Sequence, residues 1–114
     1  MARTIANAFT AARRILQDMD GDRYSDEALF VAFNQAMTEV RAKRPDLFLT
    51  IGLRAGIPVY DDAAADFPID EMYFQSVVYY VAGMIDMGES VNGDNGRAVA
   101  LMNKFASQLT GVAA

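Results

Sequence analysis

The sequence contains no cysteine and no histidine among its 114 residues. Without cysteine the chain can have neither a disulfide framework nor a thiolate metal site. Without histidine it lacks the usual general base near neutral pH and the commonest zinc ligand, which leaves carboxylates, lysine, tyrosine and hydroxyls for any chemistry. We therefore do not expect an enzyme, and the composition points to packing and assembly.

Positive charge and long apolar runs are also scarce. Ten Lys and Arg residues stand against fifteen Asp and Glu, which gives a net charge of −5 and a pI near 4.5. This balance disfavours a surface that wraps DNA or anionic lipid, although it allows a local basic patch. No run approaches the roughly 18 apolar residues of a membrane span, and we expect no secretory signal in MARTIANAF. The length fits one domain.

Apolar residues recur at helical spacing in two segments of the first half of the chain. The first segment, from about Thr4 to Gln17, places them on one stripe. The second starts after Ser25, a favourable N-cap that is followed by two acidic residues, and Pro45 ends it. The expected apolar face of this second helix consists of Leu29, Phe30, Phe33, Met37 and Val40.

The second half of the chain predicts an arm and two more helices. From Leu47 to Ile69 the helical period disappears and the β-prone runs LFLTIGL and IPVY favour a loose hairpin or extended arm, over about residues 46–69. Asp70 is a plausible N-cap for a very hydrophobic helix that runs to about Met87, and a fourth helix ends at Gly111. The predicted fold is a mainly α single domain: a four-helix bundle with an extended β-prone arm or hairpin between helices two and three.

An acidic turn between the first two expected helices has the spacing of a calcium loop. Oxygen-bearing side chains occupy alternate positions at Asp18, Asp20, Asp22, Tyr24 and Asp26. Ligands at this spacing could wrap calcium, but the position that requires glycine holds Arg23 and the position that requires a carboxylate holds Leu29. We favour a structural turn. The alternative is a metal site at Asp18, Asp20 and Asp22 in a small calcium-responsive binding module.

The segment from Leu16 to Leu47 carries a resemblance to a known family. An aromatic residue precedes a hydroxyl residue and an acidic pair, a helix follows, and a basic residue and a proline end it. These places are held by Tyr24, Ser25, Asp26, Glu27, Leu29, Phe33, Arg44, Pro45 and Asp46. The pattern resembles the turn and second helix of the head-to-tail adaptor, or connector, proteins of short-tailed bacteriophages, and the likeness extends over nearly the whole chain.

The resemblance implies a structural virion protein without a cofactor. Adaptors of this family form a ring of twelve subunits between the portal protein and a tail nozzle or tube protein, and genome DNA passes through the channel without sequence-specific binding. The expected location is the head-tail junction of a virion, after synthesis in the bacterial host cytoplasm, with no membrane contact. An acidic surface suits such a channel, because like charge discourages DNA from sticking.

Some apolar residues exceed what a monomeric bundle needs and are therefore candidates for an assembly interface. Val31 and Tyr79 lie away from the core stripes of their helices. The expected arm supplies Phe48, Leu49, Ile51, Leu53, Ile57, Val59 and Tyr60. The arm either joins neighbouring subunits or folds back over an open end of its own bundle. A free-standing regulatory helical protein that works as a dimer is a third interpretation.

Overall fold

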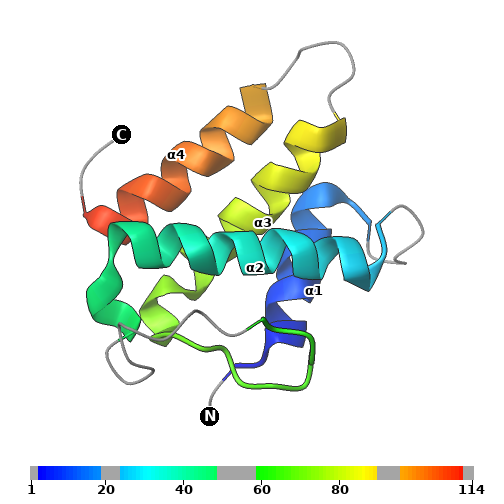
Figure 1. Cartoon of the computed structure of the whole chain (residues 1–114). Helices are drawn as coiled ribbons and strands as arrows, with labels where there is room; N and C mark the ends of the chain where they lie inside the picture. Colours follow the sequence, from blue (N-terminus) through cyan, green and yellow to red (C-terminus); the bar gives the residue numbers. More distant parts are fainter. Residues whose placement is uncertain (1–2, 19–23, 49–58, 90–95, 112–114) are drawn as a thin grey trace.

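Four α-helices form within residues 3–18, 24–48, 59–89 and 96–111, the parts of the chain that this computed structural model describes. They are α1 (Ile5–Leu16), α2 (Asp26–Lys43), α3 (Phe74–Glu89) and α4 (Gly96–Thr110) (Figure 1). A short 3-10 helix, η1 (Pro45–Phe48), follows α2, and a second, η2 (Glu71–Tyr73), precedes α3. The prediction of a mainly α chain with four helices is confirmed. None of the described helices is long and apolar enough to cross a lipid bilayer.

Local capping fixes where the first two helices begin. The Ser25 hydroxyl accepts a hydrogen bond from the Ala28 amide at 3.2 Å, as expected for the N-cap of α2. At the start of α1, the Thr4 hydroxyl accepts from the Asn7 amide, while the Asn7 side chain accepts from the Thr4 amide at 2.9 Å. This reciprocal pair satisfies two amides that have no partner inside the helix.

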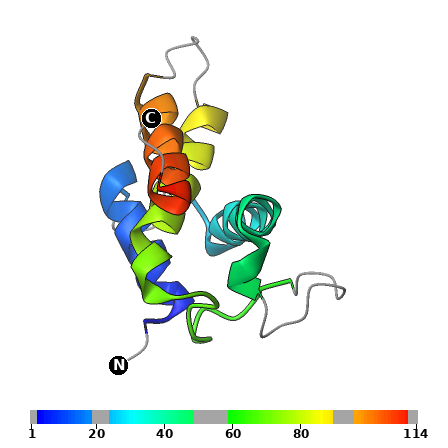
Figure 2. The same cartoon turned by 90° about the vertical axis from the view of Figure 1, so that its left-hand side faces the viewer.

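Helix α3 occupies the centre of the fold. It lies between α1 and α4 in one layer, and α2 crosses one side of that layer (Figure 1; Figure 2). Helix α3 contacts each of the other three helices. It approaches α4 closely, because a Cβ atom at Gly83 would lie 3.3 Å from the Cβ of Leu101 and 3.4 Å from the carbonyl oxygen of Ala98. The high hydrophobicity of this helix follows from its having neighbours on three sides.

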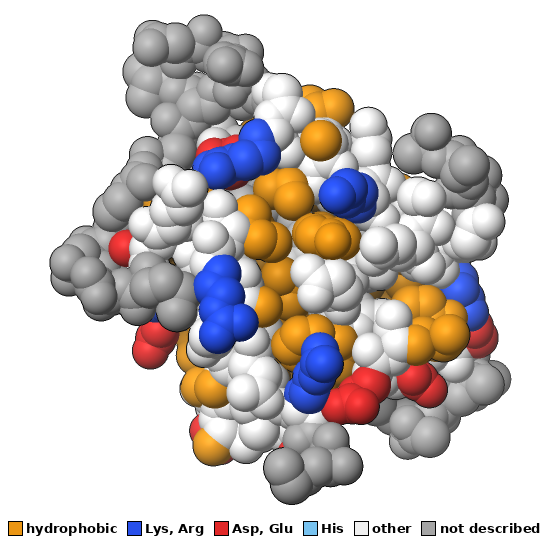
Figure 3. Space-filling model, turned by 180° about the vertical axis from the view of Figure 1, so that it is seen from behind, with side chains coloured by type: hydrophobic (Ala, Val, Ile, Leu, Met, Phe, Trp, Pro, Cys, Tyr) orange, Lys and Arg blue, Asp and Glu red, His pale blue; other side chains and the backbone are white. Residues whose placement is uncertain are grey.

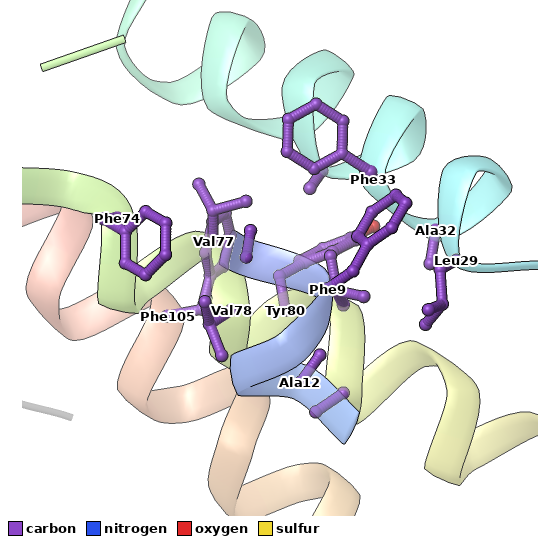
Figure 4. Close-up of a cluster of buried hydrophobic side chains, with 14 of the residues drawn as sticks. Phe9, Ala12, Leu29, Ala32, Phe33, Phe74, Val77, Val78, Tyr80 and Phe105 are labelled. Carbon is purple, nitrogen blue, oxygen red and sulfur yellow. The ribbon is translucent and has the colours of Figure 1, made fainter. Parts of the chain in front are cut away.

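The hydrophobic core draws side chains from all four helices (Figure 4). The fully buried ring of Phe33 packs edge-on against Phe9, Tyr60 and Phe67, with centroids 5.6–6.3 Å apart. Such pairs stabilise a fold by about 0.5–1.5 kcal/mol each beyond the burial of area. The predicted core face of α2 is confirmed at Leu29, Phe33, Met37 and Val40, which are buried, while Phe30 is partly buried against the same cluster. On α3, the buried residues include Phe74, Val77, Val78 and Val81.

The connection between α2 and α3 differs from the expected arm at both ends. Its first residues form η1, and residues 63–67 run along the start of α1. There the amides of Ile5 and Ala6 donate to the carbonyls of Ala65 and Ala63 at 3.0 and 2.8 Å. The physical reason is that the first amides of a helix lack partners within it, so this segment supplies acceptors. An isolated bridge joins Thr4 to Asp66, no strand forms within the described residues, and residues 49–58 lie outside them.

The core assignment can be tested with two substitutions on α2. Phe33→Ala removes a fully buried ring and is expected to lower the free energy of unfolding by about 3–5 kcal/mol. Val31→Ala on the same helix changes a side chain that is 64% exposed, so its effect is expected to stay within about 0.5 kcal/mol. Urea unfolding followed by circular dichroism measures both. Equal destabilisation by the two variants would contradict the assignment of the buried face.

Candidate functional site

The acidic turn is closed by a buried ion pair. Asp18 is 5% exposed, and its Oδ2 atom accepts from Nη1 of Arg13 at 3.0 Å and from the backbone amide of Tyr24 at 3.1 Å. Arg13 also donates to the Tyr24 carbonyl and to the Asp26 carboxylate, both at 2.8 Å. One guanidinium therefore ties the last turn of α1 to the residues that enter α2.

This arrangement bears on the candidate calcium ligands. The Asp18 carboxylate is already paired with a cation, so calcium would compete with Arg13 for it. Asp20 and Asp22 lie outside the described residues. Within the described residues, no three acidic side chains lie close enough together to hold a metal ion. The sequence analysis did not predict the ion pair between Arg13 and Asp18. The signal for it in the sequence is an arginine five residues before an aspartate at the end of a helix.

The outer side of α2 carries an exposed apolar residue. Val31 is 64% exposed, and Glu27 and Gln35, one turn away on either side, are exposed as well. The prediction that Val31 lies away from the core is confirmed. Its position leaves an apolar side chain on a helix face that no other described element covers.

Two of the candidate interface residues from the arm are fully described, and they differ. Val59 is 79% exposed. Tyr60 is half-buried, its ring lies against Phe33 of the same subunit, and burial raises the pKa of the phenol. The amide of Tyr60 donates to the Asn34 side chain at 2.7 Å, and its carbonyl accepts from the same side chain at 2.9 Å. At Tyr60 the connection thus folds back on its own subunit, which is one of the two alternatives left open by the sequence, although the contacts with Phe33 and Asn34 were not predicted. Phe48 is the last residue of η1, and its side chain lies outside the described part of the chain. The predicted interface residues Leu49, Ile51, Leu53 and Ile57 lie outside it as well.

Tyr79 lies on the side of α3 that faces away from α2. Helical spacing places it on the same stripe as Gln75 and Asp86. Tyr79 is half-buried against the edge of the core, and the ammonium group of Lys104 from α4 stands 5.2 Å from the centre of its ring. A cation in this position attracts the electron-rich ring face.

Four cationic side chains surround the stripe formed by Gln75, Tyr79 and Asp86 on α3. We call this surface the cationic face. Arg97 donates two hydrogen bonds to Asp86, at 2.9 and 2.8 Å, which raise the pKa of its guanidinium, and it reaches the Ile15 carbonyl of α1 at 3.4 Å. Beside α1, a groove of about 430 Å³ is lined by Arg3, Asn7, Thr10, Ala11, Arg14, Phe74 and Gln75. The cationic face thus consists of Arg3, Arg14, Arg97 and Lys104 around Gln75, Tyr79 and Asp86. Figure 3 views the molecule from behind, with Lys and Arg side chains spaced around hydrophobic ones.

Calcium is expected to leave the melting temperature of this protein unchanged at millimolar concentration. The reason is that the Asp18 carboxylate already accepts hydrogen bonds from Arg13 and from the Tyr24 amide. A bound ion would raise the melting temperature by mass action. Differential scanning fluorimetry with calcium, and with magnesium as the control, measures this. A shift of several degrees with calcium alone would contradict the structural interpretation of the turn.

Asp18→Asn is expected to lower the free energy of unfolding by about 1–3 kcal/mol, because Arg13 would lose its buried ion-pair partner and would be left with the exposed Asp26 as a charged partner and the Tyr24 carbonyl as a neutral one. Asp62→Asn is a matched control, since this exposed carboxylate has no ion pair in the described part of the chain. Urea unfolding compares the two variants. A loss no larger than in the control would argue against the turn as a structural anchor.

Comparisons of the chain with protein families, with curated proteins and with solved structures returned no match. The geometry of the turn and of the two exposed surfaces is therefore the basis for the function considered next.

Proposed function

We propose that this protein is a structural subunit of a head-to-tail adaptor ring in a tailed bacteriophage. In this proposal twelve copies join the portal protein to a tail nozzle or tube protein, at the head-tail junction of the virion. Genome DNA passes through the channel of the ring without sequence-specific binding. The chain carries no catalytic role and needs no cofactor.

The observation that carries this proposal is the exposure of apolar side chains outside a core that is already closed. All four helices contribute buried residues to one cluster, so the fold does not need Val31 or Val59 for its own burial. These side chains are 64% and 79% exposed. Exposed apolar side chains that form a contiguous patch are typical of surfaces that contact another chain, and in this proposal Val31 and Val59 belong to such a patch. A protein that functions as a ring subunit requires such surfaces.

The arm is part of this proposal. We assign the β-prone stretch from Phe48 to Val59 to assembly rather than to the subunit core. Its two ends are fixed by elements of the subunit: η1 precedes it, and Tyr60 is bonded to Asn34 after it. A segment held at both ends can present apolar side chains to a neighbouring subunit, and β-prone residues can pair with a neighbour's backbone.

Within the part of the chain that the structure describes, no cluster of acidic side chains supports the calcium-responsive module. Asp18 pairs with Arg13 inside the turn, and this contact accounts for the carboxylate at that position. The acidic turn is therefore assigned a structural role in the proposed subunit.

The experiment that tests the proposal is negative-stain electron microscopy of the purified chain, alone and mixed with the portal protein encoded by the same genome. Rings with a central channel, bound to the portal, are the expected result. A chain that stays monomeric and leaves the portal unbound would contradict the proposal.

A variant with residues 49–58 replaced by a short Gly/Ser linker separates assembly from folding. It is expected to melt cooperatively with native helicity, because the anchors at η1 and Tyr60 and the aromatic contacts of Phe67 remain. It is also expected to lose ring formation and portal binding. Circular dichroism and electron microscopy measure the two properties. Loss of cooperative melting would place the segment in the subunit core, and retained rings would remove it from the interface.

A further inference from the structure

The cationic face concentrates positive charge on a chain that is acidic as a whole. Four of the ten Lys and Arg residues lie on it, whereas the net charge of the chain is −5. All four side chains are exposed. Asp86 neutralises Arg97, while Arg14 and Lys104 form no ion pair within the described residues. The surface therefore presents uncompensated positive charge beside the half-buried ring of Tyr79.

A second surface of the same chain has the complementary character, and we call it the acidic face. It combines the exposed side chains of Val31 and Val59 with the exposed carboxylates of Glu27, Asp61 and Asp62. Asn34 holds its two parts together, because it lies one turn from Val31 and binds the backbone of Tyr60, between Val59 and Asp61. The segment with Val59, Asp61 and Asp62 is therefore attached to α2 one turn from Val31.

The part of the acidic face that lies on α2, with Val31, is on the side of the subunit opposite to the stripe of the cationic face. Figure 2 shows α2 standing on one side of the layer formed by α1, α3 and α4. The stripe of Gln75, Tyr79 and Asp86 is on the side of α3 opposite to Val77 and Val81, whose side chains are buried in the core. A contact between these two faces thus joins the α3 side of one copy, which we call its back, to the α2 side of the next copy, which we call its front.

We propose that the cationic face of one copy binds the acidic face of a second copy, so that subunits associate front to back. Carboxylates of the acidic face meet Arg3, Arg14 and Lys104, and the exposed valines are covered by the layer around Tyr79. Because the two faces are different, the contact is heterologous, and its repetition generates a closed ring or an open filament. The inference rests on the proposed function and names the interface that this ring would use.

Charge complementarity favours a second copy over nucleic acid as the occupant. A DNA-binding surface needs several cations free to contact phosphates. Here one of the four is paired with Asp86, and exposed carboxylates elsewhere on the chain repel a polyanion. A second copy brings both the acidic groups and the apolar side chains that need cover.

Single cysteines can map the contact, because the chain has none of its own. Val31→Cys lies on the acidic face and Gln75→Cys on the cationic face, both at exposed positions. A short bismaleimide cross-linker is expected to give a covalent dimer when the two variants are mixed and little dimer in either variant alone. Val99→Cys, half-exposed on the side of α4 away from Lys104, is the matched control and is expected to link poorly with Val31→Cys. Dimers formed mainly within single variants would overturn the front-to-back contact.

Charge reversal provides an independent measurement by sedimentation equilibrium. Lys104→Glu on the cationic face and Asp62→Lys on the acidic face are each expected to weaken self-association by about tenfold or more. Lys43→Glu makes the same charge change as Lys104→Glu outside both faces and is expected to have little effect. A mixture of Lys104→Glu and Asp62→Lys is expected to recover association, because the native pairing survives between the two variants. Equal weakening by Lys43→Glu, or a wild type that stays monomeric up to millimolar concentration, would overturn the inference.

The two proposals fail in distinguishable ways. Rings on the portal without the cross-link between positions 31 and 75 would overturn the inference and leave the adaptor function standing. If the cross-link and the charge effects are found but the portal is not bound, the adaptor function is contradicted and the front-to-back contact stands. Fluorescence anisotropy with duplex DNA tests whether nucleic acid binds the cationic face instead. If the wild type binds DNA but does not self-associate, and Lys104→Glu abolishes the DNA binding, the cationic face is assigned to nucleic acid and the inference is overturned.

Discussion

The burial of helix α3 between its three neighbours is the constraint on which the rest of the structure depends. Val77 and Val78 have no exposed surface and Val81 almost none. Burial of each such side chain contributes about 1.5–3 kcal/mol relative to exposure. Gly83 and the buried Ser76 keep this helix narrow where α4 approaches, and the Ser76 hydroxyl bonds the Gln108 side chain at 3.0 Å. The positions of α1, α2 and α4 are thus set mainly by a shared partner.

Two arginines near helix ends add further connections between the helices that pack around α3. Arg44, which follows α2, donates to the Leu109 carbonyl in the last turn of α4 at 2.7 Å and also pairs with Asp46. A cation near the carboxyl end of a helix satisfies carbonyls that lack partners and complements the helix dipole. The hydrogen bonds to Asp46 in turn hold the pKa of that carboxyl below its usual value. Arg13 performs a similar task at the junction of α1 and α2. Each guanidinium connects segments that do not share a continuous core stripe.

The features that sequence analysis predicted correctly depend on nearby residues. Ser25 as an N-cap, the buried stripe of α2 and the exposure of Val31 follow from local capping and a 3.6-residue period. The contact of Asn34 with Tyr60 joins residues 26 positions apart and depends on how the connection crosses α2, which periodicity does not encode. The cationic face was missed for the same reason. Arg14 comes from α1, Arg3 from the segment that precedes it, and Arg97 and Lys104 from α4, and these cations meet only because α3 brings the two helices into one layer.

The clamp between Asn34 and Tyr60 has a consequence for how this protein can evolve. Both ends of the stretch between η1 and Tyr60 are attached to α2 or to its continuation, so these two attachments do not depend on how many residues connect them. Closing a longer loop between fixed ends costs only about 0.6 kcal/mol for each doubling of its length. Insertions, deletions and rapid sequence change can therefore accumulate between these anchors while the helices stay as they are. Related chains with the same helices could thus differ in this one stretch and recognise different partners with it.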